Sequence, residues 1–308
     1  KSMAGTVASG NTAFMAARPI SRATFGVSAA KAYWYGSTPS RLKSTSGCVR
    51  ARRPRQRISE QTVDIGVGLE AELVQDRRSR EPEFPAGIGR LWAAAPLPPA
   101  LADYVDLVRR FNDRHGATGS ELKFYPGSPW IAKLLLRPQD RMALCELRPD
   151  DAEALDFEFA RESRVTVQAI DGYTGLKAML PPLEKRALVL IDPPFESKAE
   201  FVGIVRGIGD ALRRMPGAVL AVWYPITERA RADEFHYAVR TFATPALVAE
   251  LTIAGESSAV RMKGCGLLVL NPPWKIEAEI REVLPELAER LMVEAGGAAR
   301  CWWLVPEQ

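Results

Sequence analysis

The sequence predicts an open, doubly wound α/β sheet whose strands are mostly parallel, and three observations support this. Over the second half of the 308 residues, short apolar segments alternate with amphipathic ones. Strands joined by helices pair in parallel through right-handed crossovers. Three successive apolar segments end in an acid, Glu146, Asp171 and Asp192, and the intervals of 25 and 21 residues each match about one strand–helix unit.

The expected elements follow in chain order. Residues 87–122 predict a small helical insertion, whose main helix repeats apolar residues at spacings of three and four: Leu101, Tyr104, Val105, Val108 and Phe111. A turn at 126–129 then starts a helix from Trp130 to about Leu136. Strands are predicted within 141–149, 164–171, 186–195, 217–225, 246–253, 264–274 and 299–307. Helices are predicted within 150–163, 172–182, 198–215, 228–242 and 276–293.

Charge divides the chain into two parts. Residues 1–59 contain 11 Lys and Arg and no acid, whereas residues 60–308 hold 30 basic and 37 acidic residues. We interpret 1–59 as a basic leader that is mostly loop or disordered, or an aberrant segment, and 60–308 as the main domain with its helical subdomain at 87–122. Such a leader is typical of an arm that contacts nucleic acid or of an organellar transit peptide.

Cysteine and histidine usage excludes several classes of site. The four cysteines lie far apart without a CxxC pair, and the chain has two histidines, His115 and His236. This pattern argues against a metal site and a disulfide framework, and it favours a reducing, cytoplasmic compartment. No stretch approaches the roughly 18 to 20 apolar residues that a membrane span needs.

The three acids predict a binding site. Ligands of an open parallel sheet bind at the carboxyl ends of its strands, where Glu146, Asp171 and Asp192 are expected. An acid at the end of the second strand of such a fold can accept hydrogen bonds from both hydroxyls of a ribose. An acid one strand over is placed to accept from an adenine amino group. The alternative for each acid alone is an ordinary helix cap or strand-end residue.

The tetrad Asp192-Pro193-Pro194-Phe195 predicts chemistry at an amino group. Two prolines fix a stiff, extended exit from the strand and leave the Pro193 carbonyl oxygen available beside the Asp192 carboxylate. Two acceptors and the flat face of Phe195 suit the exocyclic amino group of a planar base, which can then attack an electrophilic methyl group. The base must come from a single strand or be flipped out of a helix.

Several further motifs carry a resemblance to a known family. The segments FYPGSPWIAKLLLRPQD, ELRPDD, DGYTGLKAMLPP, RALVLIDPPFE, AVWYPI, GLLVLNPPWKIE and WWLVPE resemble the ribosomal RNA large subunit methyltransferase J family over about residues 87–306. The resemblance implies a Rossmann-like class I S-adenosylmethionine-dependent methyltransferase acting on N6 of one adenine in protein-free 23S ribosomal RNA, without a metal and as a monomer. It further implies that Ser128, Glu146, Asp171 and Gly172 contact S-adenosylmethionine, that Asp192 is catalytic, and that Phe195 stacks on the target base.

The leading part departs from the family pattern. Family members carry a histidine-rich opening and a glycine loop after the first strand, whereas residues 1–84 contain no histidine. The segment 63–70 offers Asp64, Gly66 and Gly68 as a strand followed by a glycine turn that would let the cofactor approach. A chance match in an altered segment is the alternative.

Other candidates have weaker support. Asn271-Pro272-Pro273-Trp274 follows a late strand, so we expect a structural turn away from the cofactor, with Trp274 packing or touching RNA. Trp223 and Tyr224 are expected to line the substrate cleft, with aromatic core as the alternative. We expect both histidines at the surface, and we expect solvated helix faces, or less often phosphate contacts, for four arginines: Arg213, Arg214, Arg229 and Arg231.

Two rival functions remain open at this stage. One is a catalytically impaired relative that binds RNA without its cofactor. The other is an adenine N6-methyltransferase that acts on DNA or on another RNA.

Overall fold

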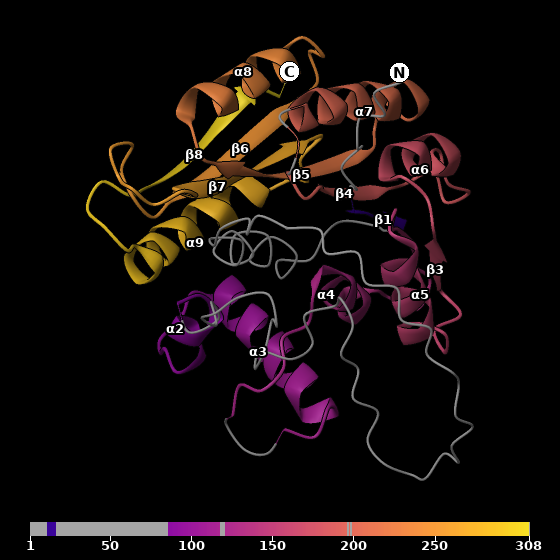
Figure 1. Cartoon of the computed structure of the whole chain (residues 1–308), viewed down its shortest axis with the longest axis horizontal. Helices are drawn as coiled ribbons and strands as arrows, with labels where there is room; N and C mark the ends of the chain where they lie inside the picture. The colour runs from indigo at the N-terminus through magenta and orange to yellow at the C-terminus, as the bar shows by residue number, and fades with distance from the viewer. Residues whose placement is uncertain (1–10, 17–85, 118–120, 196, 198, 308) are drawn as a thin grey trace, which may run out of the picture.

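The computed structural model describes residues 11–16, 86–117, 121–195, 197 and 199–307, with the side chains of 11–16 left aside. Within these residues eight strands form one sheet in the order β3-β2-β1-β4-β5-β7-β6-β8 (Figure 1). The strands are β1 (Asn11–Ala16), β2 (Arg141–Cys145), β3 (Val165–Gln168), β4 (Leu188–Asp192), β5 (Val219–Ile226), β6 (Ala246–Thr252), β7 (Gly264–Leu270) and β8 (Ala298–Val305).

The described helices are α2 (Ile88–Trp92), α3 (Pro99–Arg114), α4 (Ser128–Leu135), α5 (Pro149–Glu158), α6 (Gly172–Met179), α7 (Glu200–Arg214), α8 (Arg229–Arg240) and α9 (Ile276–Leu291). Each lies where the apolar periodicity predicts one. Prolines mark two helix boundaries, as the sequence predicts. α6 ends at Met179, ahead of Pro181, and α3 begins with Pro99 in its first turn.

The predicted doubly wound α/β fold is confirmed. Five strands, β2 to β6, point the same way. β2 pairs in parallel with β3, β4 pairs in parallel with β5, and β1 is antiparallel to both β2 and β4. β6 shares this direction because β5 and β6 are both antiparallel to β7. Three strands, β1, β7 and β8, run the opposite way. β7 reverses because a loop, and no crossover helix, connects it to β6.

Strand β1 is the part of the leader that the structure describes. Residues 1–59 were expected to be mostly loop, yet Asn11–Ala16 forms a strand between β2 and β4 and is antiparallel to both. Six residues give little periodicity, and their pairing depends on two strands more than a hundred residues away. The rest of the leader lies outside the described residues.

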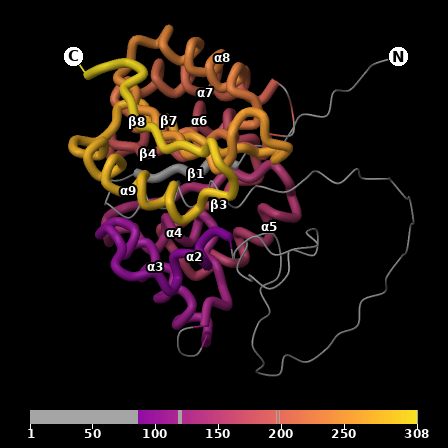
Figure 2. The backbone as a smooth tube through the Cα atoms, turned by 90° about the vertical axis from the view of Figure 1, so that its left-hand side faces the viewer, coloured from indigo at the N-terminus to yellow at the C-terminus, as the bar shows by residue number. Residues whose placement is uncertain are grey.

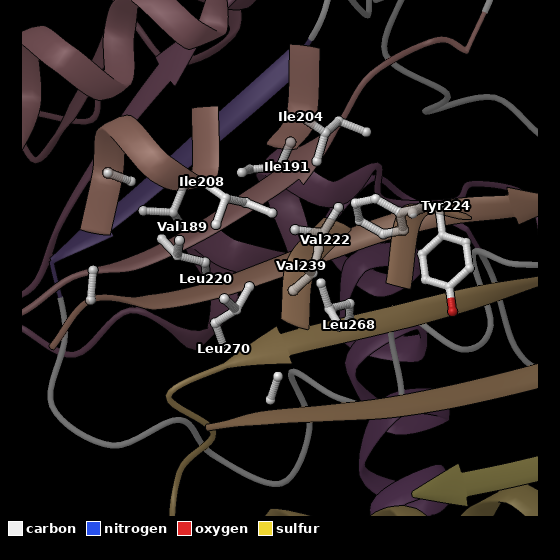
Figure 3. Packing of buried hydrophobic residues seen from close by; sticks show 14 of the residues in the cluster. Val189, Ile191, Ile204, Ile208, Leu220, Val222, Tyr224, Val239, Leu268 and Leu270 are labelled. Carbon is white, nitrogen blue, oxygen red and sulfur yellow. The ribbon is translucent and has the colours of Figure 1, made fainter. Parts of the chain in front are cut away.

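Helices cover both faces of the sheet. α6, α7 and α8 lie on one face, and α4, α5 and α9 lie on the other, with α2 and α3 beyond them (Figures 1 and 2). Side chains of a strand alternate between faces, so Val189 and Ile191 of β4 point toward α7, where Ile204 and Ile208 meet them (Figure 3). Each such buried side chain contributes about 1.5 to 3 kcal/mol.

The helical insertion packs as a layer of its own. The apolar stripe of α3 is buried, and α3 contacts α2 and α9. The hydroxyls of Tyr104 and Tyr125 lie 2.8 Å apart, and Asn112 joins α3 to the following loop by accepting from the backbone N–H groups of Lys123 and Phe124. No described helix has the length and apolar character to cross a membrane.

Candidate active site

Two of the predicted acids leave the sheet at the same level. Thr12 of β1 pairs with Cys145 of β2 on one side and with Ile191 of β4 on the other. The next residues of those strands are Glu146 and Asp192, and β1 lies between them, so their backbones are about 10 Å apart. The expectation that these carboxylates line one edge of the sheet is therefore met by the register.

Glu146 is held at that edge by the backbone. Its side chain is 3% exposed, and its carboxylate accepts a hydrogen bond of 2.8 Å from the N–H of Arg148. Burial raises the pKa of this carboxyl above the ordinary value of 4.5, while the backbone hydrogen bonds act in the opposite direction. A buried carboxylate with acceptor capacity suits a ligand that donates from two hydroxyls.

Asp171 follows β3 and caps α6. Its carboxylate accepts from the N–H of Thr174 at 2.9 Å and from the Thr174 hydroxyl at 3.1 Å. Asp171 therefore acts as a helix cap, which was the alternative expected for this acid, and capping does not exclude a second role. Gly172 is buried as the first residue of α6, and a Cβ on Gly175 would clash with the Cys145 sulfur, which shows how closely α6 packs on β2.

Ser128 begins α4, which packs against β2. Residues 136–140 connect the end of α4 to the start of β2, so the start of α4 lies toward the carboxyl edge of the sheet. Asp64, Gly66 and Gly68 lie outside the described residues.

Asp192 is the last residue of β4, and the two prolines after it carry the chain out of the sheet. Phe195 has a φ of 53°, a left-handed conformation that is uncommon for an aromatic residue. Its ring centroid lies 5.7 Å from that of Trp223 and 5.3 Å from that of Phe201. Phe195 is therefore half-buried against a fixed aromatic cluster beside Asp192.

Trp223 and Tyr224 separate, because successive residues of β5 face opposite sides of the sheet. Trp223 is level with Asp192, is 4% exposed, and reaches the site through its contact with Phe195. Tyr224 is fully buried on the other side among α7 and α8. The expectation that Tyr224 lines the substrate cleft is wrong, and the alternative, aromatic core, describes both residues.

Tyr224 belongs to a buried polar network that periodicity alone did not indicate. Its hydroxyl lies 2.8 Å from Nε2 of His236 and donates to Glu250 at 2.8 Å. Arg229 donates two hydrogen bonds to the same carboxylate, at 2.5 and 2.8 Å. Burial lowers the pKa of His236 to about 4.

This network corrects the placement of two residues. His236, expected at the surface, is 6% exposed, and Arg229 pairs with the buried Glu250. His115 is half-buried, with its ring 4.1 Å from that of Phe111. The signal that was available is the acid Glu250 in the middle of the apolar segment 246–253, since a buried charge needs a partner.

The second tetrad lies at the opposite edge. β7 is antiparallel to β5, and Leu270 pairs with Leu220 near the start of β5. The side-chain amide of Asn271 donates to the carbonyl oxygens of Pro216 at 2.7 Å and Ala218 at 2.8 Å. The expected structural turn, away from the edge that carries Asp192, is confirmed.

Among the described residues no group of three or more histidines, cysteines or acids is arranged to hold a metal ion. A shallow pocket at β8, lined by Arg281, Ala299, Arg300, Cys301 and Trp302, contains none of the residues at the carboxyl edge. The acids at the strand ends and this pocket are therefore separate features.

The strand order and the acids at the carboxyl edge, with the Pro-Pro tetrad after β4, define a class I methyltransferase. The family model described as "Ribosomal RNA large subunit methyltransferase D, RlmJ" matches residues 61–305. The chain belongs to this family. The match begins 26 residues before the expected start at about 87, so it includes the segment with Asp64, Gly66 and Gly68.

Individual relatives agree. A protein of Escherichia coli (strain K12) named Ribosomal RNA large subunit methyltransferase J is 39% identical over 237 residues, covering 77% of this chain and 83% of that protein. A protein of the same name from Haemophilus influenzae is 37% identical over 243 residues, covering 79% and 85%. A crystal structure of a Legionella pneumophila protein superposes with a TM-score of 0.66 at 30% identity, covering 76% of this chain and 85% of the other.

The described residues fit the nucleoside half of S-adenosylmethionine, the methyl donor that the family implies. Hydroxyl groups need acceptors, and Glu146 supplies a buried carboxylate at the end of β2. Asp171 and Gly172 lie at the end of the neighbouring strand, where the start of α6 brings backbone N–H groups to the same edge.

Proposed function

We propose that the protein transfers a methyl group from S-adenosylmethionine to N6 of an adenine in the RNA of the large ribosomal subunit. One observation carries the proposal: in a chain of this family, Asp192-Pro193-Pro194-Phe195 leaves the sheet at the level of Glu146, with β1 alone between their two strands.

Asp192 and the backbone orient the acceptor amino group. Its carboxylate and the Pro193 carbonyl oxygen accept the two N6 hydrogens, which holds the nitrogen lone pair outside the ring plane. S-adenosylmethionine supplies a methyl group on a sulfonium. With the cofactor bound, its methyl group would pass to N6 and S-adenosylhomocysteine would leave, and Asp192 would accept a proton from the methylated nitrogen.

Phe195 holds the flipped base. The contacts with Trp223 and Phe201 fix its ring, which supports the role of a rigid stacking partner. A left-handed φ at a non-glycine residue costs about 1 to 3 kcal/mol and persists where its surroundings over-determine it. The packed Trp223 and Phe201 are surroundings of that kind.

Ser128, Glu146, Asp171 and Gly172 hold the cofactor in this proposal. Glu146 accepts from the ribose hydroxyls, and Gly172 lets the cofactor approach the start of α6 without a Cβ in the way. Asp64, Gly66 and Gly68 are assigned to the methionine end as part of the same proposal. We further propose a cytoplasmic monomer that acts on protein-free 23S RNA.

The test is incubation with methyl-labelled S-adenosylmethionine and three acceptors: unmodified 23S RNA, other cellular RNA and DNA. Label in the 23S RNA, recovered as N6-methyladenosine after digestion, is the expected result. Label in DNA or another RNA alone supports the rival substrate. RNA binding together with no calorimetric binding of S-adenosylhomocysteine at millimolar concentration supports the impaired relative.

A further inference from the structure

The indole of Trp274 is 81% exposed, although it is the largest side chain among the exposed hydrophobic residues of the described chain. Trp274 is the last residue of the second tetrad. That tetrad lies at the edge of the sheet opposite Asp192, so it takes no part in methyl transfer. From Ala218 to Trp223, the strand β5 spans about 17 Å. Trp274 therefore plays no part in the active site itself.

The turn before Trp274 holds it outward. The Asn271 side chain bonds to Pro216 and Ala218, and its backbone N–H donates to the Pro245 carbonyl at 2.8 Å. Two prolines follow, and Ile276 then anchors the start of α9 with 4% exposure. The exposed indole is thus presented on a stiff support between the hydrogen-bonded Asn271 and the buried Ile276.

Lys275 adds a cation to the indole. Its Nζ lies 4.1 Å from the centroid of the Trp274 ring. Lys275 has a φ of 69° and sits at the N-cap of α9, where a positive charge opposes the helix dipole and no side-chain cap bond forms. Both features oppose local stability, so the arrangement is not explained as a device for stabilising the helix.

Other cations lie on the segments that the turn binds. Arg213 and Arg214 end α7, just before Pro216, and Arg240 ends α8, just before the turn with Pro245. All three are exposed. Three acids lie near these cations: Asp210 pairs with Arg213 itself and with Lys177, Glu277 accepts from Arg281 and Trp303, and Glu279 lies one turn into α9.

We propose that this Trp274 surface, formed by Trp274, Lys275, Arg213, Arg214 and Arg240, is a second contact for the substrate RNA. Trp274 stacks on an unpaired base, and Lys275, Arg214 and Arg240 contact phosphates, with Arg213, which pairs with Asp210, beside them. The charge favours RNA over a protein partner, because residues 60–308 are acidic as a whole, whereas Lys275 lies against the Trp274 ring and the last turns of α7 and α8 carry arginines. The proposal rests on the proposed function and extends it to the far edge of the sheet.

The experiment measures binding of unmodified, transcribed 23S RNA to the full chain on filters, together with single-turnover methylation at saturating RNA. Trp274→Ala is expected to raise the RNA Kd about tenfold, whereas Trp274→Phe keeps it within about threefold, because a phenyl ring still stacks. The methylation rate at saturating RNA stays within about twofold of wild type. Lys275→Gln lowers the slope of log Kd against log salt by about one.

Tyr237→Ala is the matched control, since Tyr237 is an aromatic residue on α8 with 75% exposure, outside this surface. Its RNA Kd should equal that of wild type. An unchanged Kd for Trp274→Ala overturns the proposal. So does a change in sedimentation at unchanged Kd, which indicates an interface between copies. If the wild-type chain binds the RNA without methylating it, the proposed function is contradicted. The comparison of RNA Kd values between variants still tests the Trp274 surface.

Discussion

The side-chain amide of Asn271 donates a hydrogen bond of 2.8 Å to the carbonyl oxygen of Ala218. Ala218 lies just before β5, and Trp223, five residues further along, is level with Asp192. This one contact therefore places the two Pro-Pro tetrads at opposite edges of the same sheet. Their similar sequences have different roles, and substitutions in them should have different effects.

Asp192→Ala should abolish methyl transfer, because the target amino group loses its charged acceptor. The cofactor is held by other residues in our proposal, so the Kd for S-adenosylhomocysteine should stay within about tenfold of wild type. Single-turnover methylation and calorimetry measure the two quantities. Turnover close to that of wild type would refute the assignment of Asp192.

Asn271→Ala should lower the stability of the fold and leave the methylation rate unchanged, in contrast to Asp192→Ala. Two hydrogen bonds to backbone carbonyls are lost, so we expect a fall in the unfolding free energy of about 1 to 3 kcal/mol. Denaturant unfolding measures this. At a temperature where the variant is folded, its methylation rate should match that of wild type, and a loss of rate comparable to that of Asp192→Ala would contradict the structural role.

Glu146→Gln should weaken cofactor binding at least tenfold, because hydrogen bonds to a charged acceptor are worth about 1.5 to 3 kcal/mol. The pKa of Glu146 is raised by burial, so the wild-type carboxyl takes up its proton at a pH above 4.5. Wild-type affinity should fall as the pH falls through that pKa, and the variant should lack this dependence. Calorimetry over a pH series tests it, and equal affinity of the two chains at neutral pH would contradict the role.

Gly266→Ala should destabilise the fold by about 3 kcal/mol, because the new Cβ would overlap the ring of Tyr224. That ring has no room to move without loosening its hydrogen bonds to His236 and Glu250. Gly217→Ala is the control, since its Cβ meets nothing within 4 Å, and it should change stability by less than about 0.5 kcal/mol. Similar unfolding midpoints for the two variants would show that Tyr224 is not confined.

His236 should make the unfolding free energy depend on pH. Its pKa is lowered from 6.5 to about 4 in the folded protein, so the unfolded chain binds a proton that the folded chain lacks between these values. The unfolding free energy therefore falls as the pH drops from 6.5 to about 4, by up to about 3 kcal/mol. His236→Gln removes this part, so the difference between the two chains should shrink over this interval. A constant difference would mean that His236 is protonated in the fold.

Much of the fold and the site could be predicted from local patterns. Helices such as α3 and α7 repeat apolar residues every three or four positions, and strands such as β4 are short apolar runs ending at prolines. Glu146 and Asp192 could be assigned to one edge because both follow parallel strands. β1 could not be predicted, since its six residues acquire their place by pairing with β2 and β4. The faces of Trp223 and Tyr224 depend on how β5 is oriented in the sheet.

The sequence alone determines the order of strands and helices from residue 87 onward, the acids at the strand ends and the stiffness of each Pro-Pro turn, because these follow from residue spacing and from the fixed φ of proline. The tertiary structure decides direction and partnership. β7 runs against β5, which carries Trp274 away from Asp192, and segments from α8, β5 and β6 meet to enclose Glu250. Such outcomes depend on pairing between residues that are distant in the chain, where local preference carries no information.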